Sequence, residues 1–183
     1  TYERQFPNTL RITITERKVT AVVALSSGPV AWYLGENNVW LEADQLNVPE
    51  GKTTATVALE KATSEGELLI TDVPATVSPV AGTTATDAEI QAVMQYQSTF
   101  SSELTSQIVS YSASSVDAIS VTLTNGVQVA LGSPTQIADK EKVILAMLKQ
   151  FPGELTYLNV RTPASPTYRR VSTGNVQSGS GVS

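Results

Sequence analysis

One stretch in the second half of the chain contains the pattern that most constrains how it can fold. Two short apolar runs, 118–124 and 127–131, are joined by Asn125-Gly126. Asn-Gly is the strongest short signal for a hairpin loop, because both central positions of the tight turn take positive φ. A helical pattern follows over 139–150 and ends before Pro152-Gly153. The sequence therefore predicts an antiparallel hairpin followed by a helix.

Alternation of apolar and polar residues predicts further strands. Leu10, Ile12 and Ile14 lie on one face of the first strand, and the β-branched run 18–25 continues as a strand or short connection. Aromatic runs around the Gly/Asn-rich turn 35–38 predict a second hairpin. The strands expected in these regions and near the C-terminus are 31–34, 39–41, 108–111 and 155–161.

A second helix is predicted over 87–98. Thr86 and Glu89 match a capping box, in which the threonine caps the helix and the glutamate reaches back. The segment 47–82 is weakly patterned and interrupted by prolines, so its two candidate strands, 54–59 and 68–70, could equally belong to a surface excursion.

The order of these elements predicts an α+β fold, with a mainly antiparallel sheet and two helices packed on one face of it. Composition excludes several classes of function. The chain has 183 residues, 12 basic and 17 acidic side chains, a net charge of −5, and neither Cys nor His. Disulfide scaffolds, His-based triads and His- or Cys-ligated metal centres are therefore excluded, and an acidic chain is not expected to bind nucleic acid.

No motif carries recognisable chemistry. Ser133 and Lys140 lie seven residues apart, but Lys140 is expected to face solvent from the first turn of its helix. Glu36, Glu42 and Asp44 lack the spacing of a calcium loop and are expected to be ordinary exposed acids. By elimination, the sequence predicts a binding or structural module with no catalytic residues, no metal site, no cofactor and no small-molecule substrate.

Three blocks, in order, resemble the bacterial cell-division protein family FtsQ/DivIB. The blocks are Phe6-Pro7-Asn8-Thr9-Leu10 with Ile12, Ile14, Glu16-Arg17, Val19 and Ala21; Leu123-Thr124-Asn125-Gly126-Val127 to Leu131-Gly132 with Lys140; and Tyr157-Leu158-Asn159-Val160-Arg161 to Pro163. The chain departs from the family pattern at 34–38, where an Asp-x-x-Gly turn is usual, and at Lys18, where many relatives have Pro.

The resemblance implies the last part of a POTRA domain over 1–25, a family-type β domain over 26–170 and a disordered tail over 171–183. It also implies a single-pass cell-membrane protein whose anchor and first POTRA half precede residue 1, with this domain outside the cytoplasm at the division septum. The implied function is a non-enzymatic scaffold that recruits small bitopic partners resembling FtsB/DivIC and FtsL. The alternatives are a POTRA module of a secretion or outer-membrane assembly machine and an unrelated secreted domain.

The strand over 155–161 is the predicted binding site for the partner. As the last regular element it is expected at an open sheet edge, where a partner can add a strand. Leu158 and Val160 are expected to point inward. The predicted partner-binding residues on the other face and beyond the strand are Tyr157, Asn159, Arg161 and Thr162.

Overall fold

The computed structural model describes residues 2–5, 9–12 and 17–171. Its first two strands, β1 (Tyr2–Gln5) and β2 (Thr9–Ile12), pair with each other antiparallel. The strand predicted to reach Ile14 continues into 13–16, which lie outside the described residues, as does the predicted tail beyond Val171.

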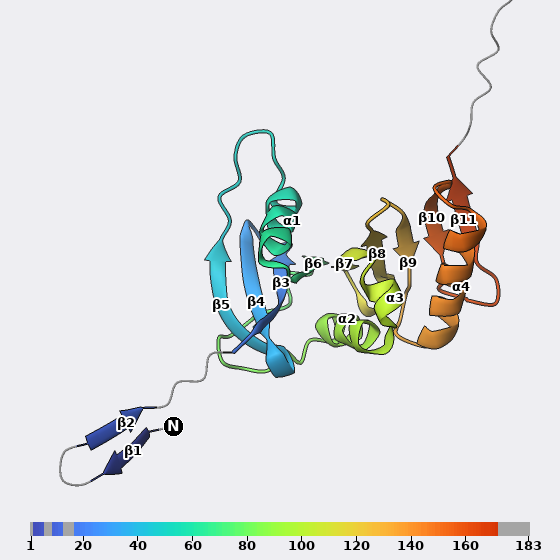
Figure 1. Ribbon diagram of the computed structural model, residues 1–183. Helices are drawn as coiled ribbons and strands as arrows, with labels where there is room; N and C mark the ends of the chain where they lie inside the picture. Colours follow the sequence, from blue (N-terminus) through green and yellow to red (C-terminus); the bar gives the residue numbers. More distant parts are fainter. Residues whose placement is uncertain (1, 6–8, 13–16, 172–183) are drawn as a thin grey trace, which may run out of the picture.

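All other strands that the structure describes form one nine-stranded sheet (Figure 1). The strands are β3 (Val19–Leu25), β4 (Val30–Gly35), β5 (Val39–Gln45), β6 (Leu68–Val73), β7 (Ile108–Ala113), β8 (Ile119–Leu123), β9 (Gln128–Ala130), β10 (Leu155–Asn159) and β11 (Thr167–Arg170). Their order across the sheet is β11-β10-β9-β8-β7-β6-β3-β4-β5.

The sheet is mixed, with parallel as well as antiparallel neighbours. Five neighbouring pairs are antiparallel, while β3–β6, β6–β7 and β9–β10 are parallel. Parallel neighbours need a crossover connection, and helices supply it here. The strand β3 lies between β4 and β6, so Val19–Leu25 shares the sheet of the residues that follow it. The assignment of 1–25 to a POTRA domain stays a prediction.

Four α-helices are described where the sequence predicted two. They are α1 (Thr54–Glu65), α2 (Ala88–Thr99), α3 (Ser102–Thr105) and α4 (Ile137–Gln150), with short 3₁₀ turns at η1 (Glu36–Asn38) and η2 (Val116–Ala118). The positions of α2 and α4 confirm the two predicted helices within two residues. The capping box is wrong, because Asp87 rather than Thr86 precedes α2 and no side chain caps the helix there.

The helix α1 replaces the predicted strand over 54–59. It begins where the Thr53 hydroxyl accepts a hydrogen bond from the Thr56 amide at 3.2 Å, and it ends at Gly66, whose φ is 73°. Only Ala58 and Ala62 on this helix are fully buried. Small alanines leave a weak periodic signal, which explains why the pattern was misleading.

Helices cover both faces of the sheet, not one as predicted. In β3, Val22 and Ala24 pack with α1 in a small core, whereas Ala21 and Val23 point into the main core beneath α2 and α4. Towards β10 the face opposite α4 carries half-buried polar side chains such as Ser112. A sheet with one solvated face is the usual antiparallel arrangement.

The hairpin predicted at Asn125-Gly126 is confirmed by the antiparallel pairing of β8 with β9. Its turn differs in detail, because only Gly126 has positive φ, at 82°. The Asn125 Oδ1 instead accepts a hydrogen bond from the Val127 amide at 3.1 Å, which stabilises the turn from its own side chain.

Candidate partner-binding edge

The strand β10 is not the edge of the sheet, which corrects the premise of the predicted site. Its residue Tyr157 lies opposite Gln128 of β9 and Arg169 of β11, so the backbone of β10 has partners on both sides. The strand that covers it, β11, follows Pro163 and Pro166 and has no alternation, since all four of its residues are exposed. The prolines therefore lie where the chain reverses between β10 and β11.

The predicted site residues lie at two levels of exposure. Tyr157 is half-buried, and the Arg169 guanidinium lies 5.3 Å from the centre of its ring. The half-buried Asn159 accepts a hydrogen bond at Oδ1 from the Arg161 amide at 3.1 Å. Arg161 and Thr162 are exposed just beyond β10. Leu158 and Val160 are fully buried in the main core, as expected.

The outer side of β11 is open. Among residues 2–5, 9–12 and 17–171, β10 is the only strand that pairs with β11, and it lies on the inner side. Tyr168 is 43% exposed although its ring stacks on Phe151 with centroids 5.1 Å apart. The Arg170 guanidinium lies 5.0 Å from the Phe151 ring centre and 3.4 Å from Glu154 Oε2. These contacts hold aromatic and cationic side chains in place along an edge that remains accessible.

A buried cluster behind this edge was missed by the sequence reasoning. Lys140, expected in solvent, is fully buried. Its Nζ donates to the Ser133 carbonyl at 2.6 Å and to the Tyr96 hydroxyl at 3.0 Å. Ile137, Lys140 and Ile144 share one buried face of α4. That spacing of three and four residues was the available signal, because it places the lysine on the apolar stripe.

Burial shifts both pKa values in the cluster towards the neutral forms. Loss of solvent lowers the pKa of Lys140 and raises the pKa of Tyr96, since burial disfavours each charged form. The lysine contacts the backbone carbonyl of Ser133 and not its hydroxyl. This geometry does not activate the serine as a nucleophile, because no contact joins the lysine to the serine hydroxyl.

The acidic candidates do not converge either. Asp44 forms an ion pair with Lys61 at 2.7 Å, and Glu36 and Glu42 are exposed. Across the described parts of the chain, no three acidic side chains are grouped as metal ligands would be.

Comparison with known proteins decides the family. The family model described as cell division protein FtsQ/DivIB, C-terminal, matches residues 55–161, more than half of the 183 residues. The chain belongs to the FtsQ/DivIB family. No curated protein matches it. The matched region runs from α1 to Arg161, so it includes Lys140 and β10 but ends before β11.

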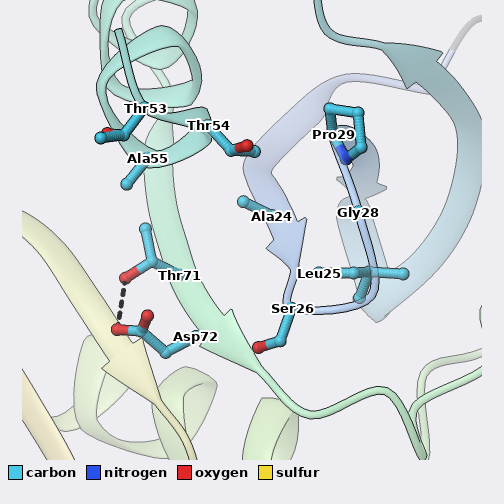
Figure 2. Close-up of a pocket in the computed structure, with 10 residues that line it drawn as sticks. All are labelled: Ala24, Leu25, Ser26, Gly28, Pro29, Thr53, Thr54, Ala55, Thr71 and Asp72. Atoms are coloured by element: carbon cyan, nitrogen blue, oxygen red, sulfur yellow. Dashed lines mark hydrogen bonds between the residues drawn. The ribbon is translucent and has the colours of Figure 1, made fainter. Parts of the chain in front are cut away.

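The described residues of this FtsQ/DivIB domain contain no helix with the length and apolar character needed to cross a bilayer. They do form a hollow of about 400 Å³ at the start of α1 (Figure 2). Thr53 and Thr54 line it from the helix, and Thr71 and Asp72, joined by a 3.1 Å hydrogen bond, line it from the end of β6. Its lining has one carboxylate and no cation, so no ligand class is indicated.

Proposed function

We propose that this domain is a non-enzymatic scaffold of the cell-division machinery, which binds its partner by strand addition along β11. The partners are small bitopic proteins resembling FtsB/DivIC and FtsL, and the site of action is the division septum, outside the cytoplasm. The observation that carries the proposal is the open β11 edge, with its exposed aromatic and basic side chains. The proposed docking strand is therefore β11, and not the strand 155–161 predicted from the sequence.

The backbone of β11 supports this mode of binding. In an edge strand, the amides and carbonyls that point away from the neighbouring strand have no ladder partner. Pairing with β10 continues past the end of β11, because the Val171 amide donates to the Glu154 carbonyl at 2.8 Å. The edge is thus held extended before any partner arrives, which reduces the ordering cost of strand addition.

Charge gives the edge its selectivity. Arg161, Arg169 and Arg170 lie at this end of the sheet, and Glu154 is the acidic side chain that contacts one of them. A positive edge on a chain of net charge −5 favours an acidic partner segment. Tyr168 adds a rigid aromatic surface, and Tyr and Arg are the side chains most often found at interface hot spots.

Calorimetric titration with the C-terminal peptide of the FtsB/DivIC-like partner tests the proposal. Arg169→Glu combined with Arg170→Glu should weaken binding by tenfold or more, because it reverses the charge of the edge. Arg161→Glu should act in the same direction. Lys18→Glu is the matched control, since this exposed lysine precedes β3, six strands away from β11.

Wild-type affinity in the Arg169/Arg170 double variant, with circular dichroism showing a folded protein, would exclude β11 as the docking edge. Depletion of the full-length protein in cells tests the cellular role, and it should give elongated, undivided cells. Normal septation after complete depletion would reject the division role.

A further inference from the structure

A lysine in the core of this domain has no acidic partner. Lys140 is fully buried, and none of the ion pairs among the described residues includes it. Its two hydrogen-bond acceptors are the Ser133 carbonyl and the Tyr96 hydroxyl. Burying an ammonium costs free energy, which these close hydrogen bonds partly offset. The two hydrogen bonds of Lys140 therefore require a structural explanation, which the position of their acceptors provides.

The bonds converge on one turn, residues 131–133, between β9 and α4. The Tyr96 hydroxyl lies 3.3, 3.2 and 2.6 Å from the carbonyl oxygens of Leu131, Gly132 and Ser133. One hydroxyl proton cannot serve three acceptors at once. Because Lys140 donates to the Ser133 carbonyl, the tyrosine proton is free for its neighbours. Lysine and tyrosine together therefore fix the path of the turn.

The outer side of this turn supports Arg161. Gly132 has φ of 71°, and a Cβ added to it would lie 2.9 Å from Arg161 Cγ. The aliphatic stem of the arginine therefore lies directly on bare glycine backbone, while the residue as a whole is exposed. The neighbouring Val160 amide also donates to the Ala130 carbonyl at 2.9 Å, so the two segments run side by side.

We infer that Lys140 is a positioning residue for partner binding. Through Tyr96 and the turn at 131–133, it fixes the surface that orients the stem of Arg161 towards an acidic partner segment. The buried charge thus serves the interface rather than the stability of the core. This inference rests on the proposed function, because Arg161 is one of the cationic side chains proposed to meet the partner. Holding a long side chain in its bound geometry raises affinity by reducing the entropy lost on binding.

Lys140→Met tests this role, with Lys142→Met as the matched control on the exposed side of the same helix. The probe is the C-terminal peptide of the FtsB/DivIC-like partner. Lys140→Met should keep its melting temperature within a few degrees yet bind about tenfold more weakly. Lys142→Met should bind like the wild type. A lysine with a purely structural role would change melting temperature and leave the affinity of the folded protein unchanged.

A double-mutant cycle with Arg161→Ala shows whether Lys140 affects binding through Arg161. If Lys140 acts through Arg161, Lys140→Met should cause no further loss of affinity in the Arg161→Ala background. An equal loss in both backgrounds, or unchanged affinity of the folded single variant, overturns the inference while leaving the proposed function intact. No binding by the wild type overturns both.

Gly132→Ala tests the same contact from the outside and replaces Lys140→Met if that variant does not fold. Its added methyl group would lie 2.9 Å from Arg161 Cγ, so the arginine stem must move, and the φ of 71° adds backbone strain to the turn in both backgrounds. It should lower affinity in the presence of Arg161 and have no effect in the Arg161→Ala background. An equal effect of Gly132→Ala in the two backgrounds also overturns the inference.

Discussion

Replacing Tyr96 by Phe should destabilise the fold by about 2–3 kcal/mol, and the buried lysine is the reason. The hydroxyl accepts a hydrogen bond from Lys140 at 3.0 Å and donates to the turn at 131–133. Removing it leaves a buried carbonyl without its donor and the ammonium without one of its two acceptors. An unsatisfied buried group costs about 1–3 kcal/mol, and more when the group is charged.

The companion variant Lys140→Met should change the free energy of unfolding by about 1 kcal/mol or less. It gives up charge-assisted hydrogen bonds worth about 1.5–3 kcal/mol each but also removes the desolvation of the ammonium. No opposite charge is left behind, because Lys140 has no carboxylate partner among the described residues. The Ser133 carbonyl keeps the Tyr96 hydroxyl at 2.6 Å.

The two changes should be coupled. In the Lys140→Met background there is no charge to strand, so Tyr96→Phe should cost about 1–2 kcal/mol, the loss of a neutral donor to a buried carbonyl. Urea unfolding at pH 7, followed by circular dichroism, measures all four proteins, and constant m-values show that the denatured states are comparable. If Tyr96→Phe cost the same in both backgrounds within about 0.5 kcal/mol, the reasoning about a stranded ammonium would be refuted.

Three further predictions concern other parts of the fold. Burial raises the pKa of Tyr111, so the stability that its buried hydroxyl contributes is complete below pH 10 and is lost as the pH rises further. Tyr111→Phe should reduce this alkaline loss of stability in urea titrations at pH 9 to 11. A loss as large as that of the wild type would contradict the prediction. Thr53→Ala should cost about 1 kcal/mol in chemical unfolding because it removes the N-cap of α1, and a neutral result would show that the cap is dispensable. Truncation after Val171 should leave the melting temperature unchanged, whereas a drop of several degrees would show that the removed residues pack on the sheet.

The sequence predicted the elements that bury large apolar side chains at regular spacing. The helix α2 was found because Ile90 and Val93 recur at helical spacing and both are buried. The β8–β9 hairpin was found because its turn dipeptide restricts the backbone locally. In both cases, a few neighbouring residues determine the local structure, so no knowledge of distant contacts was needed.

The missed elements depend on contacts that are distant in sequence. The helix α1 buries only Ala58 and Ala62 completely, and its opening Thr-Ala-Thr-Val alternates as a strand would. The parallel pairing of β3 with β6 joins segments about 50 residues apart, and strand periodicity does not distinguish it from antiparallel pairing. Local sequence patterns therefore indicated the family, but they did not show which face of the sheet each helix covers.

The strand predicted as the partner site, β10, lies one strand inside the sheet edge, and the physical reason also explains why β11 suits a partner. An edge strand has no second neighbour to bury its side chains, so its sequence loses the alternation that identifies inner strands. In β11 the residues Thr-Tyr-Arg-Arg are all exposed, which concealed the strand from pattern analysis. The same exposure leaves Tyr168 and the two arginines free to contact another chain. On an acidic protein, a short, positively charged edge discourages non-specific pairing between copies while favouring an acidic segment.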